Sequence, residues 1–107
     1  MSDGVSDLGR FAEPSLHILV SLSDGPKHGY AIMADVENIS GAPLGPGTLY
    51  GALARLESRG LIEALEPEER RRPYRITAVG ATALRAQLEQ MRGFTRAALE
   101  RLGQSRS

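Results

Sequence analysis

A short segment near the middle of the chain, residues 44–62, constrains the fold more than any other stretch. Pro46 suits the first turn of a helix, where its missing N–H costs nothing, and Gly45 is an acceptable cap before it. Gly60 suits the left-handed residue that closes such a helix. Between these ends, apolar side chains recur three and four positions apart, at Leu49, Ala52, Leu53 and Leu56. This spacing predicts a helix with one apolar face, which must be buried in a core.

The opposite face of this predicted helix is small at its start and carries hydrogen-bonding side chains. Thr48 and Tyr50 lie there with Gly51, and Arg55 follows one turn later. Such a face suits a helix whose first half enters the major groove of DNA. The alternative is an ordinary amphipathic helix whose polar face is only solvated, with the Tyr50 ring covering the core.

Length and composition set the class of protein. A chain of 107 residues predicts one domain. Thirteen basic residues balance thirteen acidic ones, and this lack of net charge counts against nucleic-acid binding. However, all of the basic residues except one are arginine, whose guanidinium can form two hydrogen bonds with a phosphate or a guanine. No apolar run reaches the roughly 18 residues of a membrane span, and the N-terminus lacks a secretory-signal pattern. Since the chain also has no cysteine, we expect a cytoplasmic protein with no membrane contact.

Two further helices are predicted upstream. Residues 14–23 are apolar on most sides, which is typical of a buried helix. His17 is the polar exception, and it suits a surface or hydrogen-bonded position because no partner lies at metal-binding spacing. Residues 27–30 lead into a second helix, whose inward stripe is predicted to be Ile32, Met33, Val36 and Ile39. A short turn containing glycine joins the second and third helices, which is the helix-turn-helix arrangement.

Two strands and a charged connection follow. Residues 61–65 and 74–77 are predicted strands. The connection, EPEERRRP, is too polar to be buried and therefore forms an exposed hairpin tip, a wing. Its arginines, Arg70, Arg71 and Arg72, are predicted to reach a phosphate backbone or minor groove. The alternative is a solvated loop whose acids and bases neutralise one another.

Thr77 can cap a last helix that runs to about residue 102, roughly 37 Å at 1.5 Å per residue. This helix is too long to pack fully on so small a domain. Its apolar residues alternate at spacings of four and three, a coiled-coil-like seam whose partner is the same helix of a second subunit. The predicted dimer interface consists of Leu84, Leu88, Met91, Phe94, Thr95, Ala98 and Leu102. The alternative is a helix folded back over its own core.

Three motifs together resemble the PadR family of bacterial transcriptional regulators. They are HGYAI at the second helix, GTLYGALARLESRGLI through the third, and RRPYRIT followed by AVG after the wing. The resemblance covers about residues 16–88. It implies a winged helix-turn-helix in the family's short form, dimerised through a single C-terminal helix. It also implies binding to an inverted-repeat operator, from which a small ligand often releases the protein.

The sequence therefore predicts a mainly α fold with a small β-hairpin. A winged helix-turn-helix spans residues 13–77 and a dimerisation helix spans 78–102, between a flexible arm (1–12) and a flexible tail (103–107). We expect a dimeric DNA-binding repressor with no enzymatic activity, metal or cofactor. The DNA contacts are assigned to Pro46, Gly47, Thr48, Tyr50, Gly51 and Arg55 for the groove, and to Lys27, His28, Tyr30 and the three wing arginines for the backbone. The alternative is a winged-helix protein-interaction module without DNA binding.

A small-molecule effector is the last expectation. The space between two subunits should accept a flat aromatic or other apolar compound. Its predicted lining is Leu16, His17, Leu88, Met91 and Phe94. The alternative is that side chains fill this space and that abundance alone controls the protein.

Overall fold

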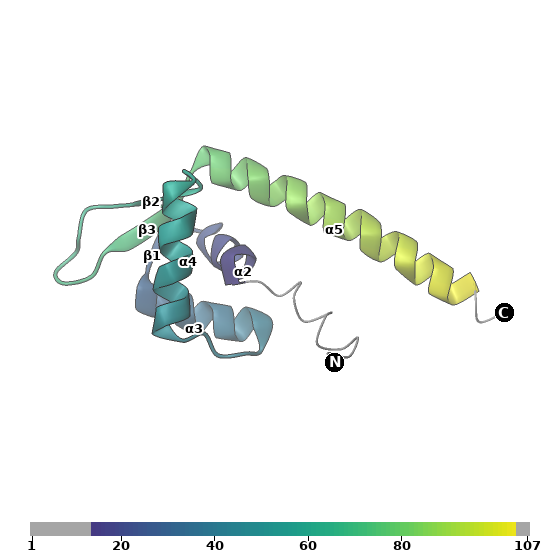
Figure 1. Ribbon diagram of the computed structural model, residues 1–107, viewed down its shortest axis with the longest axis horizontal. Helices are drawn as coiled ribbons and strands as arrows, with labels where there is room; N and C mark the ends of the chain where they lie inside the picture. Colours follow the sequence, from purple (N-terminus) through teal and green to yellow (C-terminus); the bar gives the residue numbers. More distant parts are fainter. Residues whose placement is uncertain (1–13, 105–107) are drawn as a thin grey trace.

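A computed structural model describes residues 14–104, which form four helices and three short strands (Figure 1). In chain order the elements are α2 (Pro14–Leu22), β1 (Lys27–His28), α3 (Gly29–Ser40), α4 (Pro46–Ser58), β2 (Ile62–Ala64), β3 (Pro73–Ile76) and α5 (Ala78–Gln104). The first three helices and the sheet gather at one end, and α5 extends away from them as one rod. The predicted winged helix-turn-helix with a long C-terminal helix is confirmed. The predicted N-terminal arm lies outside the described residues, and so do residues 105–107 of the predicted tail.

The ends of the helices follow from the local chemistry of the chain. Gly45 caps α4 in an extended conformation, and Pro46 occupies the first turn. Gly60 adopts a left-handed φ of 74°, as the end of α4 requires. Thr77 accepts a hydrogen bond from the Gly80 N–H at 3.0 Å and so caps α5. At its far end, α5 continues to Gln104, two residues beyond the predicted limit.

The apolar stripes of the helices meet in one core. Leu49, Ala52, Leu53 and Leu56 of α4 are all buried, as predicted. They pack with α2, α3 and the sheet through Ile18, Leu19, Leu22, Ile32, Val36 and Ile62. Ile39 does not join them, because it lies in the last turn of α3 and is 45% exposed. The inward stripe of α3 therefore ends at Val36.

The three strands form an antiparallel sheet in the order β1-β3-β2. β2 and β3 are the predicted hairpin, in which Ile62 pairs with Ile76. β1 was not predicted as a strand, because its two residues carry no alternating pattern of their own. It exists through pairing with β3, where Lys27 lies opposite Tyr74. This pairing fixes the start of α3 beside the wing.

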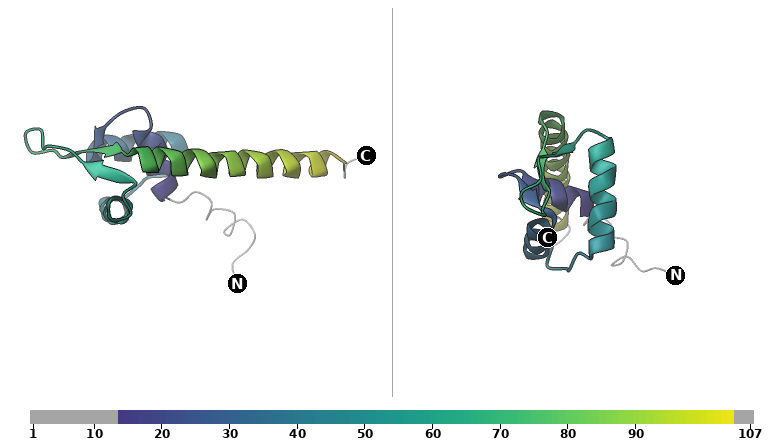
Figure 2. Two further views of the ribbon diagram at one scale, coloured as in Figure 1. Left: turned by 90° about the horizontal axis from the view of Figure 1, so that it is seen from above. Right: turned by 90° about the vertical axis from the view of Figure 1, so that its left-hand side faces the viewer.

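The first turns of α5 are attached tightly to the domain. The Thr77 hydroxyl donates to the Gly60 carbonyl at 2.7 Å, and the Thr77 N–H donates to the Leu61 carbonyl at 3.0 Å. Gly80 lies so close to the backbone before β2 that a Cβ on Gly80 would be 2.0 Å from the Leu61 oxygen. Beyond this attachment α5 leaves the domain (Figure 2), and none of its residues after Leu84 is buried. Among residues 14–104, no helix is long and apolar enough to cross a bilayer.

Candidate nucleic-acid interface

The outer face of α4 is built of small residues. Gly47, Ala54 and Ser58 are exposed and Gly51 is partly so, at spacings that align them opposite the buried leucines. A Cβ at Gly47 would meet no atom within 4 Å, and one at Gly51 would meet only a guanidinium nitrogen of Arg55, at 3.7 Å. The backbone of α4 can therefore approach another surface closely along this line.

Two polar edges border this small-residue face. Arg55 lies on the edge towards α2, where it lines a hollow of about 470 Å³ between α2, α4 and α5. Thr48 lies seven positions, about two turns, before Arg55, which places it on the same side of α4. The guanidinium of Arg55 also reaches back over Gly51, as its 3.7 Å approach shows. Tyr50 lies on the other edge, towards the wing. The predicted groove residues therefore share one exposed surface, but on its opposite sides.

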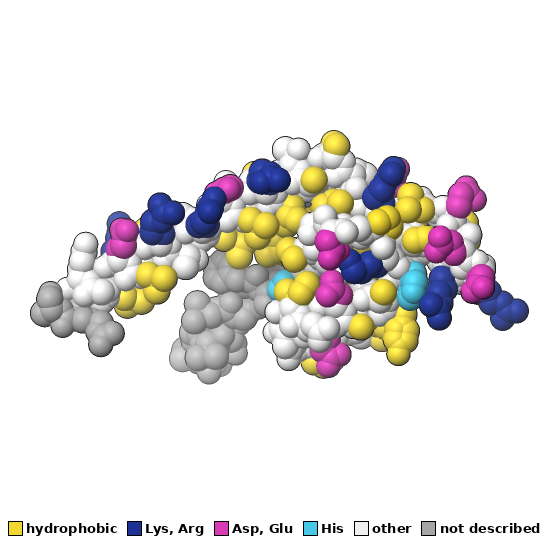
Figure 3. Space-filling model, turned by 180° about the vertical axis from the view of Figure 1, so that it is seen from behind, with side chains coloured by type: hydrophobic (Ala, Val, Ile, Leu, Met, Phe, Trp, Pro, Cys, Tyr) yellow, Lys and Arg dark blue, Asp and Glu magenta, His cyan; other side chains and the backbone are white. Residues whose placement is uncertain are grey.

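The wing ends in a closed two-residue turn. Glu68 and Arg71 exchange two backbone hydrogen bonds, of 2.7 and 2.9 Å, around Glu69 and Arg70. Glu69 takes a positive φ of 58°, so the turn is held in a backbone conformation that few residues other than glycine adopt. All three wing arginines are exposed, and the wing end of the molecule shows basic and acidic side chains side by side (Figure 3). The wing is thus a shaped hairpin and presents charges of both signs.

His28 connects α3 to the wing. Its Nδ1 accepts from the Ala31 N–H at 3.4 Å and so caps α3, and its Nε2 lies 3.1 Å from a guanidinium nitrogen of Arg71. A neutral imidazole carries one proton and can accept at only one of its two nitrogens. The neutral imidazole can therefore accept from the Ala31 N–H or from the Arg71 guanidinium, but not from both in one tautomer.

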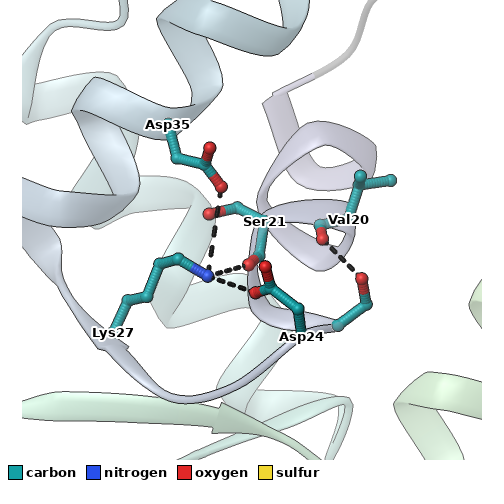
Figure 4. Close-up of polar contacts among 6 residues, drawn as sticks. Val20, Ser21, Asp24, Lys27 and Asp35 are labelled. Atoms are coloured by element: carbon teal, nitrogen blue, oxygen red, sulfur yellow. Dashed lines mark hydrogen bonds and ion pairs between the residues drawn. The ribbon is translucent and has the colours of Figure 1, made fainter.

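The Lys27 side chain does not point outward as the sequence predicted. Its ammonium points into the domain, where it donates to the Ser21 carbonyl and to the Asp24 carboxylate at 2.5 Å, with Asp35 at 4.0 Å (Figure 4). The side chain is only 21% exposed. The hydrogen bond and charge of Lys27 hold the pKa of Asp24 below its usual value. These contacts hold the ammonium within the domain, so the structure does not favour the expected contact between Lys27 and a phosphate.

A hollow of about 280 Å³ lies where α3, α4 and the wing meet. Its lining combines residues predicted separately as groove and backbone contacts: His28, Gly29, Tyr30, Tyr50, Arg70, Arg71, Arg72 and Tyr74. Burial raises the pKa of the Tyr74 hydroxyl, and the nearby Glu57 carboxylate adds to this effect. Gly29 and Tyr74 were not predicted as site residues, because only the folded chain brings them beside the wing.

The apolar side of α5 begins at the buried Leu84 and continues along the exposed part of the helix. Leu84 is 6% exposed and belongs to the core of its own domain, so its prediction as a partner contact is corrected. The remaining predicted interface residues lie beyond it, and apolar side chains follow one side of the rod while basic ones follow another (Figure 3). Leu88, Phe94 and Leu102 are 42%, 71% and 61% exposed.

The predicted effector residues do not converge within one chain. Leu16 lines the hollow beside Arg55, whereas Leu88 lines a separate hollow of about 500 Å³ on another side of α5, together with Arg85 and Arg92. Among residues 14–104, no group of three His, Cys, Asp or Glu side chains is placed to hold a metal ion.

Comparison with known proteins gives a consistent result. The family model described as "Transcriptional regulator PadR-like family" matches residues 18–86. Transcriptional regulator Rv3488 from Mycobacterium tuberculosis is 36% identical over 91 residues, which cover 82% of this chain and 81% of that protein. A transcriptional regulator from Clostridium thermocellum has a similar structure, with a TM-score of 0.74, 30% identity, and coverage of 88% of this chain and 96% of that one.

A longer relative shares only part of its length with this chain. It is a 37.1 kDa protein in transposon TN4556 of Streptomyces fradiae, 46% identical over 82 residues. These residues are 77% of this chain but 24% of the relative, so the chain spans about a quarter of that protein.

Proposed function

The chain belongs to the PadR-like family of transcriptional regulators, and from this premise we propose that it is a dimeric repressor of an inverted-repeat operator. One observation carries the proposal: α4 exposes a face of small residues beside an arginine-bearing wing. Such a face lets a helix backbone enter a major groove, while the wing reaches the adjoining phosphates. Since it acts on DNA, we place the protein in the cytoplasm.

The DNA contacts divide between bases and backbone. Thr48 and Arg55, at the edge of the small-residue face, are assigned to base edges, because an arginine fork pairs with guanine and a threonine can contact either base type. Pro46, Gly47 and Gly51 let the backbone approach. The wing arginines, with Tyr30 and His28 at the start of α3, are assigned to phosphates. Lys27 is excluded from this group by its contacts inside the domain.

The uncovered apolar side of α5 supports the dimer. Leu88, Phe94 and Leu102 are large apolar side chains that are 42%, 71% and 61% exposed. A second α5 packed along this side removes them from water in a self-complementary contact. The remaining interface residues are Met91, Thr95 and Ala98. The two α4 helices would then enter successive major grooves about 34 Å apart, which is why an inverted repeat is the expected operator.

An apolar effector between the subunits completes the proposal. In the dimer, Leu88, Met91 and Phe94 of each copy would line a space near Leu16 and His17. A compound bound there regulates only if it prefers one spacing of the α4 helices, and a tenfold loss of operator affinity needs about 1.4 kcal/mol of differential binding. Calorimetry with planar aromatic compounds, with and without operator DNA, measures this difference. Equal affinity in both states would remove ligand control from the proposal.

The experiment that tests the core proposal is DNA binding by fluorescence anisotropy. The duplex is the segment upstream of the protein's own gene, measured beside a scrambled duplex at about 0.15 M salt. Thr48→Ala and Arg55→Ala should each cost on the order of 1–3 kcal/mol on the operator and little on scrambled DNA. A dimer that binds neither duplex would instead support a protein-interaction module. A reporter gene behind the operator, silent only with the protein present, distinguishes a repressor from an activator.

A further inference from the structure

The end of the Tyr50 side chain occupies space that a side chain at position 29 would need. An ideal Cβ on Gly29 would lie 2.6 Å from the Tyr50 hydroxyl oxygen and 3.1 Å from Cζ. Gly29 is buried at the start of α3, whereas Tyr50 is 53% exposed on α4. The absence of a side chain at Gly29 therefore allows the Tyr50 hydroxyl to lie against α3.

The surroundings of this hydroxyl are those of a DNA-backbone contact. Tyr50 shares the 280 Å³ hollow with Arg70, Arg71 and Arg72. Within residues 14–104 its hydroxyl makes no hydrogen bond, so its donor is available to a ligand. Three guanidinium groups favour an anionic ligand, and a tyrosine hydroxyl is a common donor to phosphate oxygens in protein–DNA complexes.

The position of Tyr50 on α4 points the same way. The side chain leaves the edge of the helix nearest the wing and turns towards α3, away from the line of Gly47 and Gly51 that faces outward. A base edge would have to be reached along that outward line, whereas the hollow lies beside it.

We propose that Gly29 is a positioning residue for Tyr50. By leaving space at the start of α3, Gly29 fixes the Tyr50 hydroxyl in the hollow, where it donates to a DNA phosphate flanked by the wing arginines. Tyr50 then contributes affinity for the DNA backbone and does not read a base. This inference rests on the DNA-binding function proposed above.

Gly29→Ala is a suitable perturbation because the fold should tolerate it. The φ of Gly29 is not in the left-handed region, and alanine is favourable in a helix. The atoms that must move are the end of a flexible tyrosine side chain, and the nearest other contact, Leu49 Cδ2, is at 3.4 Å. The substitution therefore displaces the hydroxyl and leaves the core intact.

The experiment compares the full-length wild type with Gly29→Ala, Tyr50→Phe and their double variant. Anisotropy is measured on operator and scrambled duplexes, and thermal unfolding checks the fold. Each single variant should bind both duplexes roughly ten- to hundredfold more weakly, as expected for one lost hydrogen bond to a charged group. The double variant should be no weaker than Tyr50→Phe, because both changes remove the same contact. Tyr30→Phe is the matched control, and its effect should add to that of Gly29→Ala.

A second measurement identifies the phosphate directly. Operators that each carry one neutral methylphosphonate are bound by the wild type and by Tyr50→Phe. One position in each half-site should weaken the wild type more than it weakens Tyr50→Phe, because both proteins lose the arginine contacts to that phosphate but only the wild type also loses the hydroxyl contact. If Tyr50 had only a structural role, every substituted position would weaken the two proteins equally.

Distinct results overturn the inference. Loss of operator binding alone in Tyr50→Phe would mean that Tyr50 reads a base. Unchanged affinity in Gly29→Ala, or additive losses in the double variant, would mean that Gly29 does not position Tyr50. If the wild type binds no DNA, the proposed function fails together with this inference. Wild-type binding with unaffected variants refutes this inference alone.

Discussion

Replacing Lys27 by methionine separates a structural role from a DNA contact. Methionine keeps an apolar stem of similar length and removes the ammonium, which donates to the Ser21 carbonyl and neutralises Asp24 and Asp35. We therefore expect a less stable domain whose DNA binding keeps its salt dependence.

The size of the loss follows from the burial of each partner. The hydrogen bond from the charged ammonium to the Ser21 carbonyl is partly buried, and such a bond contributes about 1.5–3 kcal/mol. Asp24 is 79% exposed, so water screens its pair with Lys27 and the pair adds little. Asp35 lies at 4.0 Å, beyond hydrogen-bonding distance, and also adds little. The expected cost is about 2 kcal/mol, which corresponds to a fall in Tm of roughly 10 °C for a domain of this size.

Two assays give the answer together, with Arg70→Met as the matched control. Urea unfolding is measured at one fixed protein concentration, because the stability of the proposed dimer would depend on concentration. The affinity for DNA is measured against salt. Lys27→Met should lose stability and keep the wild-type salt slope, whereas Arg70→Met should keep stability and reduce the slope by about one. The reverse pattern, a stable Lys27→Met protein with a shallower salt slope, would show that the ammonium faces DNA and refute the reasoning.

Three further outcomes are expected. Leu88→Glu combined with Phe94→Glu should give a monomer by light scattering, because the dimer would bury unpaired carboxylates; an unchanged dimer would place the interface elsewhere. Gly80→Ala should lower the Tm sharply, since its Cβ would lie 2.0 Å from the backbone oxygen of Leu61 and one of the two segments must move; wild-type thermal stability would contradict the close approach. The pKa of Asp24 is lowered in the folded state, so its contribution is present above the usual value of 3.8 and is lost as the pH falls through the lowered pKa. Asp24→Asn should therefore reduce the stability gained between about pH 2 and 5 in acid-unfolding curves, and identical curves would argue against the pairing with Lys27.

The sequence was sufficient where local chemistry decides the structure. Gly45, Gly60 and Thr77 have side chains or backbone preferences that end or begin a helix in any surroundings, and the structure has them in these roles. The buried leucines of α4 follow from their spacing alone. The buried face of α4 and the order of the helices and the hairpin could therefore be predicted without knowledge of the packing, whereas β1 and the exposure of Ile39 could not.

The sequence was insufficient where distant segments compete for one side chain. Lys27 carries a charge that suits a phosphate, and only the approach of α2 and α3 turns it inward. Leu84 fits the dimer seam by spacing, but the point at which α5 leaves the domain lies after it. The placement of Tyr50 depends on the space at Gly29, twenty-one positions earlier in the chain, which no helical pattern records.

The attachment of α5 to the end of α4 has a mechanical consequence. Thr77 joins the Gly60 carbonyl to the first turn of α5, and Gly80 presses that turn against the Leu61 carbonyl. Because these contacts leave little room at the junction, we expect α5 and the end of α4 to rotate together. A helix of 27 residues is about 40 Å long, so a 5° change in the angle between two such helices displaces their far ends by about 3.5 Å. In the proposed dimer, a ligand bound between the two α5 helices would therefore change the spacing of the two α4 helices relative to the DNA grooves without bending either domain.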